Sequence, residues 1–344
     1  MKAMVLKGKN QPLVLDTVPD PVPGPGEAVA RILACGAGLT IHHVRAGRVP
    51  VQYPRILGHE ITAEIVATGA GVTRLKAGDA VTAYFYLTCG HCYWCRINRE
   101  TLCENFGGYV GRECDGGYAE YIKLPAENFI PLPESLDYRK HAAEIGVICD
   151  AIATPLKVTR KARVMPTDTV AVIGAGGGLG VHMLMVSRWA HARKVIAVDT
   201  KASKFESCVK CGADATIDAS DGKVSEQLIE MTGGKGVDVV FDYVCTKQSI
   251  ESAIGGLNVG GRLVLLAGNS ARFDADGPVI MRKEIEVMGS RYATKQEVIE
   301  SLELVARGDL WPLVNEKVPM ADAEAVHQRL ETGSVTGRAA LIMT

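Results

Sequence analysis

The sequence predicts a two-domain α/β protein, in which a mostly β domain is joined to a doubly wound parallel sheet. Three observations lead to this fold class. A chain of 344 residues is long for a single hydrophobic core. Its first part, to about residue 150, consists of short β-like runs broken by Gly and Pro. From Thr169 onward, apolar strands alternate with helical segments, which is typical of a parallel sheet covered on both faces.

The mostly β domain is expected to occupy residues 1–154 and 291–344. Its strands are expected in the runs AVARILAC (28–35), ITAEIVATGAGV (61–72) and DAVTAYFYL (79–87). The closing run RAALIMT is a further candidate strand, and we expect it to rejoin the first domain after the chain leaves the second.

The parallel sheet is expected within residues 155–290. Its candidate strands are TVAVIG (169–174), KVIAVD (194–199), DATID (214–218), VDVVFD (237–242) and RLVLLAG (262–268). Helical segments separate these runs, as in a doubly wound dinucleotide-binding fold.

A glycine-rich turn follows the first of these strands. Glycines there allow a tight turn and a close approach to a pyrophosphate, whose charge then lies at the N-terminus of the next helix. The candidate cofactor residues in this turn are Gly174, Gly176, Gly177, Gly178, Leu179 and Gly180. Asp199 ends the second strand, where a carboxylate can accept the adenosine ribose hydroxyls and repel a 2′-phosphate, which favours NAD over NADP. Lys204 is placed to flank the same ribose, whereas in the alternative interpretation Asp199 only caps the following helix.

Four cysteines form the most specific motif in the chain. They are spaced C-x2-C-x2-C-x7-C within a lobe at about residues 88–105, and they are Cys89, Cys92, Cys95 and Cys103. Four thiolates close a tetrahedral shell around zinc and leave no open position, so the predicted site is structural. Cys208 and Cys211 are also spaced C-x-x-C, but at helical spacing, and we interpret them as buried thiols of a helix.

The composition indicates which class of molecule the protein binds and in which cellular compartment it is expected. Lys and Arg number 38 against 39 for Asp and Glu, so net charge gives no reason to expect nucleic acid or an anionic membrane as a partner. No uninterrupted apolar run has the length of a membrane span. We therefore expect a cytoplasmic protein whose partner is a small molecule, and cysteines that serve as metal ligands or free thiols rather than disulfides.

These motifs together resemble those of the zinc-containing medium-chain alcohol dehydrogenases. The resemblance extends along essentially the whole chain and includes Gly58-His59-Glu60, Gly78-Asp79, the four-cysteine lobe and the DGGYAEY run at 115–121. It implies a GroES-like catalytic domain, a Rossmann domain and NAD-linked oxidation of alcohols or reduction of carbonyls. It also implies assembly as a homodimer or homotetramer.

One loop departs from the pattern of that family. The family typically reads C-G-x-C-x-[ST]-D-x-H, and the corresponding stretch here is CGAGLTIHHVRAG (35–47). Thr40 and His43 then match the hydroxyl residue and the histidine of the family's proton relay. The cysteine that is normally the first ligand of the catalytic zinc is replaced by Gly38. His42 is new relative to the pattern, and we expect it to be a surface side chain.

The sequence does not decide whether the protein keeps a catalytic metal ion. The resemblance places His59, Glu60 and Asp150 at positions that could supply three ligands for a retained zinc, with Thr40 receiving the alcohol proton and His43 acting as the general base. The function is then interconversion of a secondary or cyclic alcohol and its ketone or aldehyde. In the alternative, the metal is lost and the enzyme adds hydride to an α,β-unsaturated carbonyl. A third reading is a dinucleotide-binding sensor without turnover.

Overall fold

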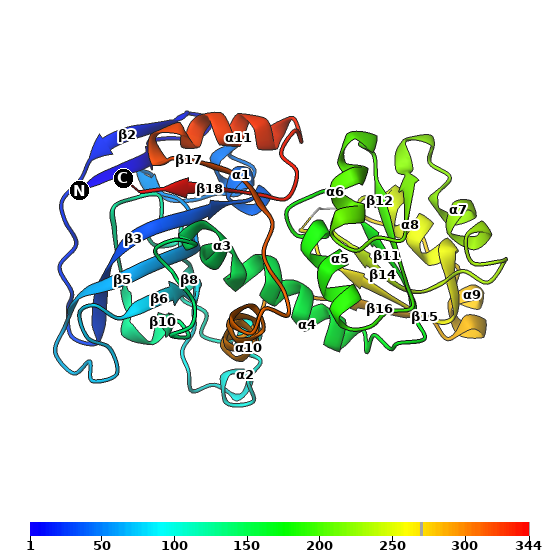
Figure 1. Cartoon of the computed structure of the whole chain (residues 1–344), viewed down its shortest axis with the longest axis horizontal. Helices are drawn as coiled ribbons and strands as arrows, with labels where there is room; N and C mark the ends of the chain where they lie inside the picture. The colour runs from blue at the N-terminus through cyan, green and yellow to red at the C-terminus, as the bar shows by residue number, and fades with distance from the viewer. Residues whose placement is uncertain (269–270, 344) are drawn as a thin grey trace. The chain divides into compact units, whose positions relative to one another are not determined.

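The computed structural model describes residues 1–268 and 271–343, which form two compact units (Figure 1). Unit 1 contains Met1–Ala153 and Ala293–Thr344, and unit 2 contains Thr154–Tyr292. The long helix α4 (Ala153–Lys161) begins at the boundary. Among the helices of the described residues, none combines the length and the apolar character needed to cross a bilayer.

Unit 1 is built on a sheet with the strand order β10-β6-β5-β3-β18-β17, in which β9 also pairs with β3. Two smaller sheets, β2-β1-β4 and β7-β8, complete its strands. The strands of unit 1 are β1 (Lys2–Leu6), β2 (Leu13–Thr17), β3 (Glu27–Ala37), β4 (Arg55–Ile56), β5 (Glu60–Thr68), β6 (Ala80–Ala83), β7 (Tyr86–Leu87), β8 (Gly108–Tyr109), β9 (Tyr121–Pro125), β10 (Phe129–Pro131), β17 (Val314–Pro319) and β18 (Arg338–Ile342).

Unit 1 also contains helices, of which α1 (Leu39–Arg45) and α2 (Tyr93–Arg96) carry predicted site residues. The others are α3 (Ala142–Val147), α10 (Lys295–Ala306) and α11 (Ala323–Glu331), with 3-10 turns η1 (Glu100–Leu102), η2 (Ala126–Asn128) and η6 (Met320–Asp322). Between α3 and α4 lies one turn of π-helix, η3 (Ile148–Ile152), a wide turn that is often found at functional positions.

The last strand, β18, lies inside the large sheet of unit 1, between β3 and the edge strand β17. It pairs antiparallel with β3, with Ala339 opposite Ala37 and Leu341 opposite Cys35, and parallel with β17. The first four residues of β18 are buried. Both chain ends therefore lie in unit 1, and the closing strand joins the first unit as expected (Figure 1).

Unit 2 is a parallel sheet in the order β13-β12-β11-β14-β15-β16, which is the doubly wound order that starts from a central first strand. Its strands are β11 (Thr169–Ile173), β12 (Lys194–Asp199), β13 (Ala215–Asp218), β14 (Val237–Asp242), β15 (Leu257–Leu265) and β16 (Glu286–Gly289). Its helices are α5 (Gly180–Trp189), α6 (Phe205–Lys210), α7 (Val224–Glu230), α8 (Lys247–Gly256) and α9 (Gly277–Lys283), with 3-10 turns η4 (Ala202–Lys204) and η5 (Ala219–Asp221). The predicted fold class is confirmed, and β16 is a sixth strand that the sequence did not reveal.

Buried histidines hold α1 against α11. His327 of α11 is fully buried, and its Nε2 lies 3.1 Å from the hydroxyl of Tyr118. Its ring stacks on that of His42 with centroids 5.7 Å apart. His42 is itself fully buried and contacts the carboxylate of Glu331. The expectation that His42 is a surface side chain was therefore wrong, because α11 covers the loop that carries it.

Burial of His327 predicts a sensitivity to acid. Burial lowers the pKa of His327 from 6.5 to about 3, so the folded protein keeps this ring neutral at pH values where the unfolded chain protonates it. Stability from this group is complete above pH 6.5 and is lost as pH falls toward 3, by about 1.4 kcal/mol per pH unit. We expect His327→Gln to flatten the fall in urea-unfolding free energy between pH 6.5 and 5, whereas His191→Gln, at an exposed position, leaves the slope unchanged. Equal slopes in all three proteins would contradict this.

Candidate functional site

The four cysteines of the predicted zinc lobe converge on one point. Their sulfurs lie 3.5 Å apart for Cys92–Cys95 and Cys89–Cys103, and 4.0 Å apart for Cys89–Cys95 and Cys92–Cys103. Sulfurs at about 2.3 Å from a tetrahedral zinc ion are separated by roughly 3.8 Å. The lobe therefore has the size and the donor chemistry of a closed zinc site.

Backbone amides donate hydrogen bonds to some of these sulfurs. The Cys92 amide donates to Cys89 Sγ and the Cys89 amide donates to Cys103 Sγ, both at 3.4 Å. Backbone N–H groups, that of His91 foremost, lower the pKa of the Cys89 thiol to about 5. Because a thiolate is the form that binds metal, Cys89 is prepared to bind zinc at neutral pH, and hydrogen bonds from the backbone also lower the pKa of Cys92. Burial instead raises the pKa of Cys95 to about 12 and also raises that of Cys103.

The glycine-rich turn of unit 2 lies between β11 and α5, as the sequence predicts. Gly174 has a φ of +78°, which favours glycine, and a Cβ at Gly180 would lie 2.2 Å from the carbonyl oxygen of Gly174. Helix α5 begins at Gly180, so the absence of a side chain there lets the helix start directly against the strand. Gly177, Gly178 and Leu179 complete the turn before the helix begins.

Asp199 lies at the carboxyl end of β12, next to this turn. Its Oδ2 accepts a hydrogen bond from the Gly176 amide at 2.9 Å, and its Oδ1 accepts one from the Lys201 amide at 3.1 Å. A Cβ at Gly176 would lie 2.5 Å from the side chain of Lys204, which is itself buried. The turn, the carboxylate and the lysine therefore form one cluster, and a dinucleotide's phosphates and ribose fit its chemistry.

His59, Glu60 and Asp150 come together in unit 1. Glu60 opens β5, His59 immediately precedes it, and Asp150 lies in the π-helical turn η3. One ligand atom from each lies within 4.8 Å of the others, and all three side chains are buried. The His59 ring stacks on Phe85 with centroids 4.3 Å apart, and its Nε2 lies 3.9 Å from Asp150 Oδ2.

Arg338 lies among these three residues, and sequence reasoning missed it. Its Nη2 is 2.6 Å from Glu60 Oε1 and 2.9 Å from Asp150 Oδ2. The arginine side chain is 5% exposed, against 2% and 3% for the two carboxylates, so the three charges share one dry environment. Removing one partner from a buried ionic group of this kind costs about 3–5 kcal/mol, because the remaining charges are left uncompensated.

Two glycines make room for this ionic cluster. A Cβ at Gly36 would lie 1.9 Å from Glu60 Oε2, and a Cβ at Gly38 would lie 2.2 Å from Arg338 Nη1. Gly36 lies in β3, and Gly38 follows that strand directly and precedes α1. Gly38, where the predicted resemblance expects a metal-binding cysteine, therefore leaves space for the guanidinium.

The charges of this cluster decide whether a second zinc fits. Burial raises the pKa of Glu60 from 4.5 to about 8, although the nearby Arg338 acts in the opposite direction. A zinc ion bound here would need both Glu60 and Asp150 as ligands, with oxygens at about 2.0–2.2 Å. Arg338 already contacts both carboxylates. The residues as arranged do not fit a second zinc ion, because a cation lies between two of the three candidate ligands.

Thr40 and His43 lie three residues apart on α1, so both can face the same side of the helix. Arg48 donates a hydrogen bond to His43 Nδ1 at 3.1 Å and also pairs with Glu331. Burial, followed by the positive charge of Arg48, lowers the pKa of His43. In this arrangement the lone pair at Nδ1 is in use, so action as a base requires Arg48 to turn away.

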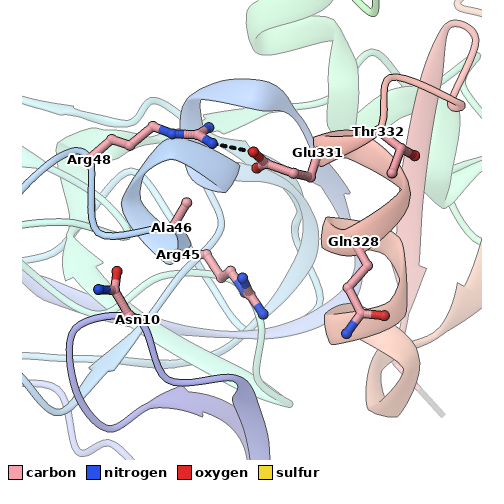
Figure 2. Close-up of a pocket in the computed structure, with 7 residues that line it drawn as sticks. All are labelled: Asn10, Arg45, Ala46, Arg48, Gln328, Glu331 and Thr332. Carbon is pink, nitrogen blue, oxygen red and sulfur yellow. Dashed lines mark hydrogen bonds and ion pairs between the residues drawn. The ribbon is translucent and has the colours of Figure 1, made fainter.

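A cavity of about 310 Å³ lies beside Arg48, between the end of α1 and α11 (Figure 2). Its lining consists of Asn10, Arg45, Ala46, Arg48, Gln328, Glu331 and Thr332. The cavity contains none of the sequence-predicted site residues. Two of its lining residues act on His43, because Arg48 donates a hydrogen bond to its Nδ1 and the charge of Glu331 affects its pKa.

Comparisons with known proteins agree with this architecture. Residues 24–134 match the model of the alcohol dehydrogenase GroES-like domain, and residues 178–307 match that of zinc-binding dehydrogenases. An alcohol dehydrogenase of Geobacillus stearothermophilus is 32% identical over 99% of both chains, and an NAD-dependent alcohol dehydrogenase of Sulfurisphaera tokodaii is 29% identical over 99% of this chain and all of that one. The crystal structure of the Aeropyrum pernix alcohol dehydrogenase superposes with a TM-score of 0.91 at 30% identity, covering 99% of this chain and all of the other. The chain therefore belongs to the zinc-containing medium-chain alcohol dehydrogenase family.

Proposed function

We propose that this protein is an NAD(H)-dependent oxidoreductase that interconverts a secondary or cyclic alcohol and its ketone or aldehyde by hydride transfer. The observation that carries the proposal is the cluster of Asp199 with the glycine-rich turn at the carboxyl end of the unit 2 strands. Full-length relatives that are named alcohol dehydrogenases support the reaction class.

Unit 2 is proposed to bind the dinucleotide. Gly174, Gly176, Gly177, Gly178, Leu179 and Gly180 would receive the pyrophosphate at the start of α5. Asp199 would bind the adenosine ribose, and its negative charge would exclude a 2′-phosphate. Lys204 packs beside Gly176, so its role there is to support the turn and to flank the ribose.

Unit 1 is proposed to supply the reaction residues and the structural zinc. Cys89, Cys92, Cys95 and Cys103 would hold zinc without taking part in the reaction, because four thiolates leave no open position. Thr40 would accept a hydrogen bond from the substrate hydroxyl, and His43 would accept the proton once Arg48 Nη1 moves away from His43 Nδ1. His59, Glu60, Asp150 and Arg338 would form the charged wall near this relay.

A second reaction is favoured by one specific observation, which is the buried guanidinium of Arg338 against Gly38. A fixed guanidinium near the reaction residues can stabilise a delocalised enolate by charge and hydrogen bonding. The second candidate is therefore reduction of an α,β-unsaturated carbonyl by hydride addition to the carbon β to the carbonyl. Interconversion of alcohol and ketone stays the leading proposal, because the full-length relatives are named alcohol dehydrogenases.

We also propose a cytoplasmic location and assembly as a homodimer or homotetramer. None of the ten cysteines, all among the described residues, is in a disulfide, and this supports a reducing compartment. The small-molecule substrate follows from the reaction class.

One labelling experiment separates the two reactions. The protein is incubated with a cyclic enone and with NADH that carries deuterium at the transferable position, and the product is analysed by mass spectrometry and NMR. We expect deuterium at the former carbonyl carbon of an allylic alcohol. Deuterium at the carbon β to the carbonyl of a saturated ketone would establish the second candidate instead. Absence of turnover with enones, ketones and secondary alcohols alike would contradict both.

The choice of cofactor depends on the charge of Asp199. Asp199→Asn keeps an oxygen that can accept from the Gly176 amide but removes the charge that repels a 2′-phosphate. We expect the ratio of the NADPH and NADH dissociation constants to shift toward NADPH by about tenfold or more, equivalent to about 1.4 kcal/mol. Asp218→Asn is the matched control, because Asp218 lies opposite Asp199 in the neighbouring strand. Fluorescence titration measures both constants, and an unchanged ratio in Asp199→Asn would refute the assignment.

Loss of one thiolate should open the zinc lobe. We expect Cys95→Ser to lose its zinc, measured by elemental mass spectrometry, and to unfold at a lower temperature. Each 1 kcal/mol lost lowers the Tm by about 2–4 °C in a domain of roughly this size. Cys114→Ser changes a half-buried thiol outside the cluster and should retain both properties. Normal zinc content in Cys95→Ser would contradict the assignment.

A further inference from the structure

We propose that the Arg338 guanidinium replaces the catalytic metal ion that the resemblance implies beside His59, Glu60 and Asp150. The chain would then hold a single zinc ion, in the four-cysteine lobe. This inference concerns what the charged centre contains rather than which substrate reacts. It therefore goes beyond the proposed function, and its test requires no substrate.

The first argument comes from the register of the sheet. Strand β18 pairs with β3 so that Ala339 lies opposite Ala37, and the next residue on each strand places Arg338 opposite Gly38. A Cβ at position 38 would lie 2.2 Å from Arg338 Nη1, a distance that side-chain atoms do not reach. A side chain at position 38 and the guanidinium in its present position therefore exclude one another.

The second argument comes from the contacts that the guanidinium makes. Arg338 Nη2 contacts Glu60 Oε1 at 2.6 Å and Asp150 Oδ2 at 2.9 Å, and all three side chains are at most 5% exposed. These carboxylates are two of the three candidate ligands, the third being His59. The arginine therefore compensates the charges that a metal ion would otherwise compensate.

The third argument is the total charge of the centre. Even with both carboxylates ionised, the centre carries only −1, and adding a divalent ion without displacing the arginine gives +1 beside a guanidinium that cannot lose its proton. Protonation of Glu60, which its raised pKa favours, makes the total more positive still. An uncompensated positive charge is costly in a buried site. A metal could enter only by driving out the arginine, and at 5% exposure the arginine is enclosed by the fold.

Zinc content tests the inference directly. Purified wild-type protein, incubated with excess zinc and then passed through a desalting column, is analysed by elemental mass spectrometry. We expect one zinc per chain in the wild type and none in Cys95→Ser. Two zinc ions per chain in the wild type, or one remaining in Cys95→Ser, would overturn the inference.

A variant of the arginine provides the converse test. Arg338→Met removes the charge while keeping an unbranched apolar side chain, and it leaves His59, Glu60 and Asp150 in place. We expect a second zinc per chain in this variant, together with a rise in Tm on adding zinc that the wild type does not show. Arg139→Met, which removes an exposed arginine paired with Glu64 at 2.6 Å, should behave like the wild type. One zinc and no rise in Tm in Arg338→Met would show that the arginine does not stand in for a metal.

These outcomes are separate from those of the reaction assay. If Arg338→Met does not fold, the counts in the wild type and in Cys95→Ser still decide the inference. A protein with one zinc and no turnover would keep the inference and refute the proposed function. A protein with two zinc ions that oxidises alcohols would refute the inference and support the proposed function.

Discussion

The pairing of β18 with β3 is the constraint on which the centre of unit 1 depends. The two strands meet antiparallel, and their register alone decides which residue lies opposite Gly38. Because side chains alternate between the two faces of a sheet, a slip of one residue would turn Arg338 away from Glu60 and Asp150. The same register brings Leu341 opposite Cys35 within the core. Apolar packing of β18 therefore fixes the position of a charge.

The ionic cluster of Arg338, Glu60 and Asp150 is costly to bury, and each of its members requires the others. Arg338 needs two acceptors in a place without water, Glu60 and Asp150 need a cation, and Gly36 and Gly38 provide the volume for these groups. A buried ion pair contributes little net stability when complete, but it destabilises strongly when one member is removed. Such a cluster behaves as a single unit, in which no residue can be exchanged for an uncharged one without a compensating change elsewhere.

The sequence predicted the elements whose signals are local. The unbroken apolar runs VIAV and VVF lie within β12 and β14, because strands buried on both faces lack polar alternation. Strand β16 was missed because its sequence, EVMG, is short and mostly exposed at the edge of the sheet. The four cysteines and the glycine-rich turn were found because each lies within a short segment.

Two side chains whose burial depends on distant contacts, Arg338 and His42, were not predicted correctly. Arg338 reads as an ordinary arginine before the apolar run AALI, and only the pairing of β18 with β3 shows that it is buried. One signal was available, since a glycine at the position of a metal ligand leaves a volume that another side chain must fill. His42 was misjudged for the same reason, because the covering helix α11 comes much later in the sequence.

The order of synthesis gives the late position of β18 a further consequence. A nascent chain completes all of unit 2 before β18 leaves the ribosome, so the part of β3 that pairs with β18 stays uncovered during that time. During the same time Glu60 and Asp150 lack their contacts with the Arg338 guanidinium. Unit 2 can form its parallel sheet from one continuous segment, whereas unit 1 closes only when its final strand arrives. Unit 1 therefore begins first during synthesis but is completed last, after all of unit 2.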